Sequence, residues 1–239
     1  MQDKKLPKAV LFDLDDTIIA FDSVSLPVWE EISLIYSSLL GVSKEELLGA
    51  VLDASRWYWG DVQRHRIGRN NQREARREIV KTGLRKLGLE ESENWNALAD
   101  AYSQKRLEAV HLFPGSIETL QHFRGQGVKL VLVTNGEAPL QREKIERFGL
   151  SPYFDGIFIE GEVGYGKPEE RFYSLALESV SAGPEECWIV GDNLEWEVEV
   201  PGKMGFYTVW NDIRGKGLPA GSSVFPHRIV RSIRELIDF

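Results

Sequence analysis

The sequence predicts an α/β protein, with a doubly wound parallel sheet as its core and an inserted all-helical cap domain. Five short runs rich in Val, Ile, Leu and Phe lack clean alternation, which is typical of strands buried on both faces. Helical patterns separate the last four runs. The stretch between the first two is far longer than a crossover needs. A chain of 239 residues, 42% of them hydrophobic, can hold such a core and insertion.

The predicted strands cover residues 9–12, 129–133, 156–159, 188–190 and 206–210. Apolar residues at helical spacing predict three helices between the last four strands. Their shared faces carry Ile117, Leu120 and Phe123, then Leu140, Ile145 and Phe148, then Phe172, Leu175, Ala176 and Ser179. The last stretch, 229–237, also has helical spacing, and we expect it to pack on the sheet as a final helix.

The insertion is predicted to be helical throughout. Ser43 and Glu46 form a capping-box pattern before an apolar run. Pro114 and Gly115, in the stretch "HLFPGS", mark the return to the core. These signals predict a core domain of residues 1–20 and 113–239 and a cap domain of residues 21–112.

Charge and cysteine content restrict the classes of protein. The net charge of −8 argues against binding to nucleic acid or to an anionic membrane surface. The single cysteine, Cys187, excludes an internal disulfide and suits a cytoplasmic location. No apolar run is long enough to span a membrane. Residues 62–87 carry nine Lys and Arg against two Glu, which favours a solvated helix face with one or two residues available to an anionic substrate.

Polar side chains follow the predicted strands where a parallel sheet places its ligand site, beyond the carboxyl ends. They are Asp13, Asp15 and Asp16 after the first strand, Thr134, Asn135 and Gly136 at the second, Lys167 after the third and Asp192 after the fourth. Clustered carboxylates require a positive partner. Mg²⁺ held by Asp13 and Asp192 would supply one, and Lys167 adds a fixed charge. This set suits a phosphoryl group.

Two other motifs are incomplete. "GEVGYGKP" fits a P-loop until Pro168, which stands where Ser or Thr must hold Mg²⁺. A calcium loop beginning at Asp13 lacks its glycine and glutamate, because Ile18 and Val24 stand there. Nucleoside triphosphatase and calcium-loop readings are therefore rejected.

The motifs "DLDDT", "TNG", "GKP" and "GDN", in this order, resemble the four motifs of the haloacid dehalogenase (HAD) superfamily. The resemblance covers nearly the whole chain, and the helical insertion resembles the subfamily I (C1) cap. It implies an aspartyl-phosphate mechanism with Asp13 as nucleophile and Asp15 as general acid and base. Lys167 would pair with the nucleophile and the phosphate.

The resemblance further implies a phosphate-binding pair, Thr134 and Asn135, with Gly136 beside them. The Mg²⁺ ligands would be Asp13, Asp192 and the backbone carbonyl of Asp15. The fourth motif departs from the family pattern, because Glu197 stands where an aspartate is usual. Either Glu197 or Glu195 is left to support the metal.

Asp15 favours a phosphatase over a 2-haloacid dehalogenase, since a phosphoester oxygen needs a proton to leave and a halide does not. A phosphate-binding regulatory protein with little turnover is the third alternative. The expected substrate is a small phosphorylated metabolite of the sugar phosphate, nucleotide or phosphoglycolate type. Arg56 and Trp57 in the cap are candidate substrate-binding residues. We expect a monomer or homodimer.

Overall fold

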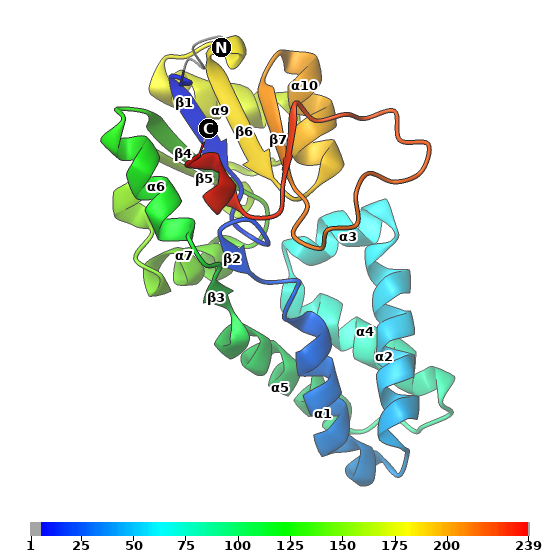
Figure 1. Ribbon diagram of the computed structural model, residues 1–239. Helices are drawn as coiled ribbons and strands as arrows, with labels where there is room; N and C mark the ends of the chain where they lie inside the picture. Colours follow the sequence, from blue (N-terminus) through cyan, green and yellow to red (C-terminus); the bar gives the residue numbers. More distant parts are fainter. Residues whose placement is uncertain (1–5, 239) are drawn as a thin grey trace. The chain divides into compact units, whose positions relative to one another are not determined.

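The computed structural model describes residues 6–238, which form two compact units. The core unit comprises the chain up to Ala20 and from His111 onward, and the helical unit comprises Phe21–Val110. Figure 1 shows the strands in the first and a set of helices in the second. None of the helices in the described part of the chain has the length and hydrophobicity needed to cross a bilayer.

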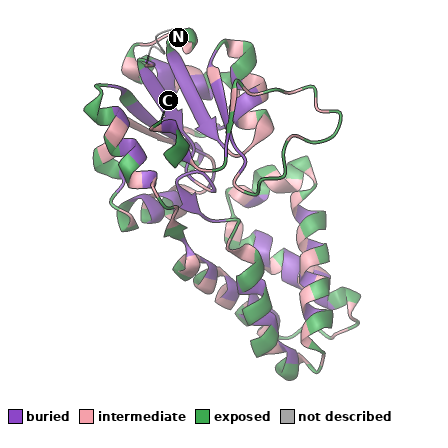
Figure 2. Ribbon diagram, viewed as in Figure 1, coloured by how far each residue is buried: buried purple, intermediate pink, exposed green. Residues whose placement is uncertain are grey.

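The core unit contains a six-stranded sheet in which all neighbouring strands are parallel. Its strand order is β5 (Gly156–Ile159), β4 (Lys129–Thr134), β1 (Ala9–Phe12), β6 (Cys187–Gly191), β7 (Tyr207–Asn211) and β8 (Arg228–Val230). The parallel α/β sheet and its five predicted strands are confirmed. Strands β1, β4 and β6 form its centre and are almost wholly buried (Figure 2).

The prediction of a final helix over residues 229–237 was wrong. Residues Arg228–Val230 form β8, which pairs with β7, and only a short 3₁₀ turn, Ile233–Leu236, follows. Val230, Ile233 and Leu236 are buried, so the apolar spacing is real. The apolar spacing reflects the buried residues of two short elements, β8 and the 3₁₀ turn. Periodicity alone cannot distinguish such a pair from one helix.

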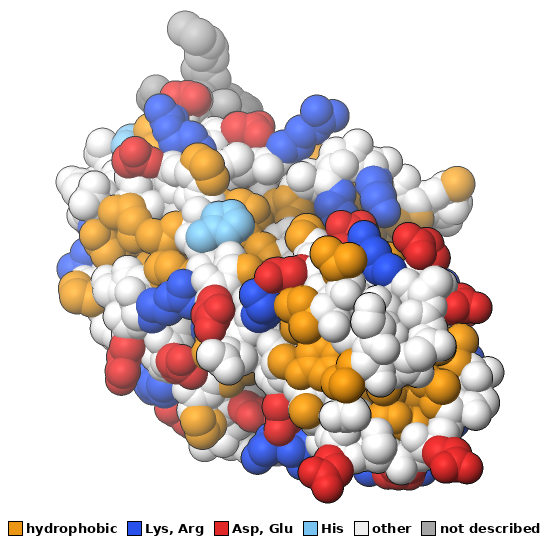
Figure 3. All heavy atoms as spheres, turned by 90° about the horizontal axis from the view of Figure 1, so that it is seen from below, with side chains coloured by type: hydrophobic (Ala, Val, Ile, Leu, Met, Phe, Trp, Pro, Cys, Tyr) orange, Lys and Arg blue, Asp and Glu red, His pale blue; other side chains and the backbone are white. Residues whose placement is uncertain are grey.

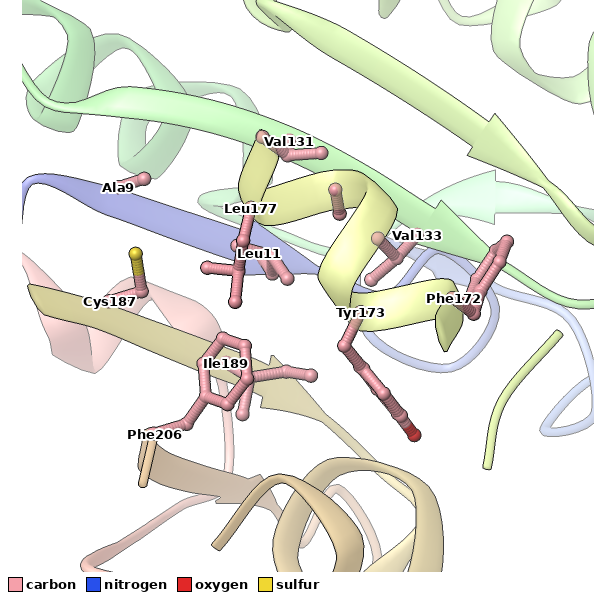
Figure 4. Close-up of a cluster of buried hydrophobic side chains, with 11 residues drawn as sticks. Ala9, Leu11, Val131, Val133, Phe172, Tyr173, Leu177, Cys187, Ile189 and Phe206 are labelled. Carbon is pink, nitrogen blue, oxygen red and sulfur yellow. The ribbon is translucent and has the colours of Figure 1, made fainter. Parts of the chain in front are cut away.

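Helices cover both faces of the sheet. They are α6 (Ser116–Gly125), α7 (Ala138–Arg147), α8 (Glu160–Val163), α9 (Glu170–Val180) and α10 (Val200–Met204). On one face, Phe172, Tyr173 and Leu177 of α9 pack against β1, β4 and β6 (Figure 4). On the other, Phe123 of α6 lies 6.3 Å from Phe12, ring centre to ring centre. Because alternate strand residues face opposite sides, both sides of each strand are used in packing.

The helical unit consists of α1 (Ser25–Leu40), α2 (Lys44–Trp59), α3 (Val62–Arg69), α4 (Gln72–Lys86) and α5 (Glu93–Ala109). The predicted capping box begins α2: the Ser43 hydroxyl accepts from the Glu46 N–H, and the Glu46 carboxylate accepts from the Ser43 N–H. A separate apolar core fills this unit, with Trp29 stacked on Tyr102 at 3.6 Å.

The insertion leaves the core unit at a small antiparallel ribbon of β2 (Ile19–Ala20) and β3 (His111–Leu112). Ala20 pairs with His111, so both ends of the helical unit join the core unit at one place. His111 and Leu112, which were predicted as the last cap residues, belong to the core unit as part of this ribbon.

Candidate active site

The carboxyl ends of the three central strands, β4, β1 and β6, bring the predicted residues to one edge of the sheet. Phe12 pairs with Leu132 on one side and Val190 on the other, and the Asp13 N–H donates to the Val190 carbonyl at 2.9 Å. Thr134 ends β4, and Asp192 directly follows β6. Residues far apart in the sequence thus meet where a parallel sheet binds its ligands.

A buried ion-pair cluster, which we call the Lys167 cluster, joins Lys167, Asp13 and Glu197. The Lys167 ammonium lies 2.6 Å from Asp13 Oδ1 and 2.7 Å from Glu197 Oε1. All three residues are buried. The second oxygen of Asp13 accepts from the Thr17 hydroxyl at 3.2 Å. The Asp13 carboxylate is therefore held at both oxygens.

Two buried carboxylates share one lysine in this cluster, and the pKa of each carboxylate is shifted as a result. Burial raises the pKa of Asp13, although Lys167 opposes the shift. Burial raises the pKa of Glu197 to about 7, again against Lys167 and with the Asp13 charge adding to it. Burial alone would lower the pKa of Lys167, but the two carboxylates outweigh it and raise that pKa, so the ammonium stays charged. When both acids are ionised, two negative charges face one positive charge, so a further cation would stabilise the cluster.

Glu197 reaches Lys167 by folding over a glycine. A Cβ atom at Gly191 would collide with Cγ of Glu197, so the end of β6 must be glycine. The other Glu197 oxygen accepts from the Asn193 N–H at 3.0 Å. These contacts begin a single π-helical turn, Leu194–Glu199, of the kind often found at functional sites. Glu195, the alternative acid, is exposed.

The amide of Asn135 is engaged with the backbone of Lys167. Its Oδ1 accepts from the Lys167 N–H at 2.8 Å, and its Nδ2 donates to the Lys167 carbonyl at 2.7 Å. The Gly136 N–H donates to Glu160 Oε2 at 3.1 Å. The Asn135 side chain thus fixes the lysine loop, and phosphate binding by Asn135 and Gly136 stays a prediction.

Asp15 stands on the turn between β1 and β2, and this turn depends on a left-handed residue. Asp16 has φ of 54°, a conformation that aspartate tolerates better than most side chains. The Asp16 N–H donates to the Ile19 carbonyl at 2.7 Å and closes the turn. The Asp15 carboxylate, 25% exposed, is held by the Lys144 ammonium at 2.7 Å from each oxygen.

Lys144 and Gln141, both on α7, were missed from the sequence. The predicted face of this helix was Leu140, Ile145 and Phe148, whereas its buried residues are Gln141, Lys144 and Ile145. A lysine next to the buried Ile145, one turn after a glutamine, was the available signal. A search for apolar residues at helical spacing does not find Lys144 and Gln141, because it assigns polar residues to the solvent-facing side of a helix.

Mg²⁺ binding by the donors at this edge stays a prediction. Asp13 follows β1, and Asp192 follows β6, which is the neighbour of β1 in the sheet. The third predicted ligand, the backbone carbonyl of Asp15, belongs to the turn that begins after Asp13. Among residues 6–238 no three His, Cys, Asp or Glu side chains form a cluster able to hold a metal. Two carboxylates and a carbonyl match the habit of Mg²⁺, which keeps several of its waters.

The two candidate substrate-binding residues of the insertion lie on α2 of the helical unit. Arg56 is exposed and pairs with Asp53. Trp57 is 43% exposed, and the Arg64 guanidinium lies 4.0 Å above its ring. A substrate role for Arg56 and Trp57 stays a prediction.

Known proteins are similar to this chain in sequence. The model of the haloacid dehalogenase-like hydrolase family matches residues 7–201. Glyceraldehyde 3-phosphate phosphatase of Methanocaldococcus jannaschii is 25% identical, over 97% of this chain and 96% of that protein. Phosphoserine phosphatase of Thermus thermophilus is 37% identical over 140 residues, which span 58% of this chain and 55% of that enzyme.

Solved structures are similar along the whole chain. The HAD-hydrolase YfnB from Bacillus subtilis, described as bound to magnesium, superposes with a TM-score of 0.75 at 22% identity, covering 98% of each chain. A 2-haloacid dehalogenase from Pseudomonas syringae gives a TM-score of 0.62 at 22% identity, covering 98% of this chain and 97% of that one. At such identities the likeness establishes the fold.

The chain belongs to the haloacid dehalogenase-like hydrolase family, as the four motifs had indicated. It is a hydrolase whose core unit carries the family's sheet and whose insertion is helical.

Proposed function

We propose that this hydrolase is a Mg²⁺-dependent phosphatase that cleaves phosphomonoesters of small metabolites through an aspartyl-phosphate on Asp13. One observation carries the proposal: the two carboxylates of one strand end, Asp13 and Asp15, are each held by a separate buried lysine. Two acids fixed side by side can divide the work of nucleophile and proton carrier.

The first half of the reaction moves the phosphoryl group to the enzyme. Asp13 attacks phosphorus, a bond forms between its carboxylate oxygen and phosphorus, and the ester oxygen leaves with its electron pair. Asp15 gives that oxygen its proton. The Lys167 charge offsets the repulsion between the Asp13 carboxylate and the phosphate.

The second half restores Asp13. Asp15, now ionised, takes a proton from a water molecule, which attacks phosphorus and releases inorganic phosphate. Mg²⁺, held by Asp13, Asp192 and the Asp15 carbonyl, would supply charge neutralisation at the phosphoryl oxygens. We infer that Glu197 supports Lys167, because one of its oxygens accepts from the Lys167 ammonium and the other is fixed by the Asn193 N–H.

The named relatives indicate the range of substrates to test. They act on phosphoserine, glyceraldehyde 3-phosphate and, for an Escherichia coli relative that is 28% identical over 95% of both chains, pyrimidine 5'-nucleotides. The proposed substrate is likewise a small phosphorylated metabolite. The cytoplasmic location and the monomeric or homodimeric state stay predictions.

The test is phosphate release from a panel of sugar phosphates, nucleotides, phosphoserine, phosphoglycolate and 4-nitrophenyl phosphate. It compares Mg²⁺ with EDTA, and the wild type with Asp13→Asn. We expect release that needs both the metal and Asp13. No release from any compound by folded protein would contradict the proposal, and halide release from 2-haloacids would support the dehalogenase alternative.

A further inference from the structure

Two buried polar residues of α7, which we call the α7 pair, connect the proposed proton carrier to the phosphate-binding strand. Lys144 is 0% exposed and Gln141 is 1% exposed. The Lys144 ammonium contacts both Asp15 oxygens at 2.7 Å. The Gln141 amide nitrogen lies 3.2 Å from Asp15 Oδ2 and 2.5 Å from the Thr134 hydroxyl oxygen. It also lies 3.0 Å from the Asn135 carbonyl.

Folding gives no reason for a lysine at this place. Burying an ammonium is expensive, and a well-packed apolar side chain is often as stabilising or more so. The next residue, Ile145, is buried without a charge on the same helix. The structure thus carries a desolvated lysine directly against a carboxylate that stands at the site's edge.

The α7 pair also orients Thr134. Since the Thr134 hydroxyl oxygen accepts from Gln141, its own proton is directed elsewhere, and the only acceptor found for it among the described residues is the Asn135 carbonyl at 3.5 Å. That proton is available for a phosphate oxygen. Because the Asn135 carbonyl can only accept a hydrogen bond, the donor end of the Gln141 amide is the one that faces these groups.

We propose that Lys144 and Gln141 are positioning residues, which fix the Asp15 carboxylate and the Thr134 hydroxyl relative to the reacting phosphoryl group. This inference rests on the proposed phosphatase function. Asp15 is partly exposed on a turn whose neighbouring residues, Leu14 and Asp16, are buried. The contacts of Lys144 and Gln141 with its oxygens restrict its side-chain rotation. A displacement of about 1 Å in such a group lowers catalysis by about 10²-fold.

The leaving group provides the test, because only a poor leaving group needs the proton of Asp15. The variant Lys144→Met keeps an unbranched side chain, one heavy atom shorter, and removes its charge. With an alkyl phosphate, we expect kcat/KM to fall by about 10²-fold, mostly through kcat. With 4-nitrophenyl phosphate, whose leaving group is stable without a proton, we expect a fall of less than about 10-fold. Gln141→Met should show the same selectivity with a smaller loss.

The matched control is Lys129→Met, which removes a lysine that contacts Asp155 at 2.8 Å in the same unit. This variant should leave kcat/KM unchanged for both substrates. Equal losses on both substrates in Lys144→Met would overturn the proposal, because general damage to the site does not distinguish leaving groups. A wild type inactive on both substrates would instead contradict the phosphatase function.

A double-mutant cycle covers the case in which Lys144→Met folds poorly. The variant Asp15→Asn with Lys144→Met leaves no unpaired charge between these two residues. If Lys144 acts through Asp15, the double variant should hydrolyse the alkyl phosphate as fast as Asp15→Asn alone, within about 3-fold. A further loss of 10-fold or more would assign Lys144 a different role.

Discussion

Lys167 in the core unit contacts Asp13 and Glu197 with all three residues buried, whereas Asp100 in the helical unit is held by Arg73 and Arg77 at the surface. The surface pairs join side chains that retain water, and such pairs contribute little to stability. The buried cluster has lost its water, so each member depends on the others. The same kinds of residue thus form solvated pairs in one unit and a buried cluster of fixed geometry in the other.

The basic segment of the insertion follows the surface pattern. Several of its arginines and lysines pair with acids of the helical unit itself, as Arg77 does with Asp100 and Arg85 with Glu91, whereas Arg76 is buried. Acidic and basic side chains are interspersed on the face of the molecule shown in Figure 3. The interpretation of a mostly solvated helix face accounts for these residues.

The largest expected effect is the loss of activity when Asp13 of the core unit is replaced, compared with Asp100 of the helical unit. Asp13→Asn should lower kcat by about 10⁴-fold or more, since the amide cannot accept the phosphoryl group. Asp100→Asn, the control in the helical unit, should leave kcat within about 2-fold because its partners are surface arginines. Both are measured as steady-state phosphate release. Comparable losses in the two variants would break the comparison.

The second effect concerns stability. Lys167→Met leaves Asp13 and Glu197 as neighbouring buried acids without a cation, and the free energy of unfolding should fall by about 3–5 kcal/mol at pH 8. Urea denaturation in EDTA measures it. The folded-state pKa of both acids is raised, so their ionisation opposes folding as pH rises, and the loss should shrink toward pH 5. A loss below about 1 kcal/mol would show that the Lys167 cluster contributes no more to stability than a surface ion pair does.

The third effect is metal binding. Mg²⁺ at 100 times its Kd should stabilise the core unit by about 2.7 kcal/mol, seen as a higher Tm that EDTA reverses. Asp192→Asn should abolish the shift, and Asp100→Asn should retain it. If the two units unfold in separate transitions, only the core unit's transition should move. A shift that survives Asp192→Asn would place the cation elsewhere.

The smallest effect belongs to the surface pair. Arg77→Met should lower the free energy of unfolding only slightly, far less than Lys167→Met does, and less still in 1 M salt. Hydrogen bonds from Arg73 and Arg77 lower the pKa of Asp100 to about 2. This contribution is therefore present above pH 4 and is lost as pH falls toward 2. Equilibrium denaturation at pH 7 and pH 2.5 measures it, and an effect as large as that of Lys167→Met would refute the surface assignment.

Local patterns were sufficient to predict five of the six strands of the main sheet and the residues at their ends, whereas β8 was predicted as part of a helix. Asp13, Thr134 and Asp192 each directly follow or end a short apolar run, and parallel strands bring such positions to one edge. The contacts of Glu197 with Lys167 could not be predicted, because they require a π-helical turn over Gly191. Lys144 was missed for a related reason, since only tertiary structure reveals that a lysine faces the interior.

The ribbon of β2 and β3 makes the insertion a replaceable module. Ala20 and His111 face one another as paired residues, so a tight turn could join them in place of the whole helical unit. No strand of the main sheet would have to change its neighbours. Evolution, or a protein engineer, can therefore exchange or lengthen what is grafted at this point while inheriting the catalytic sheet intact.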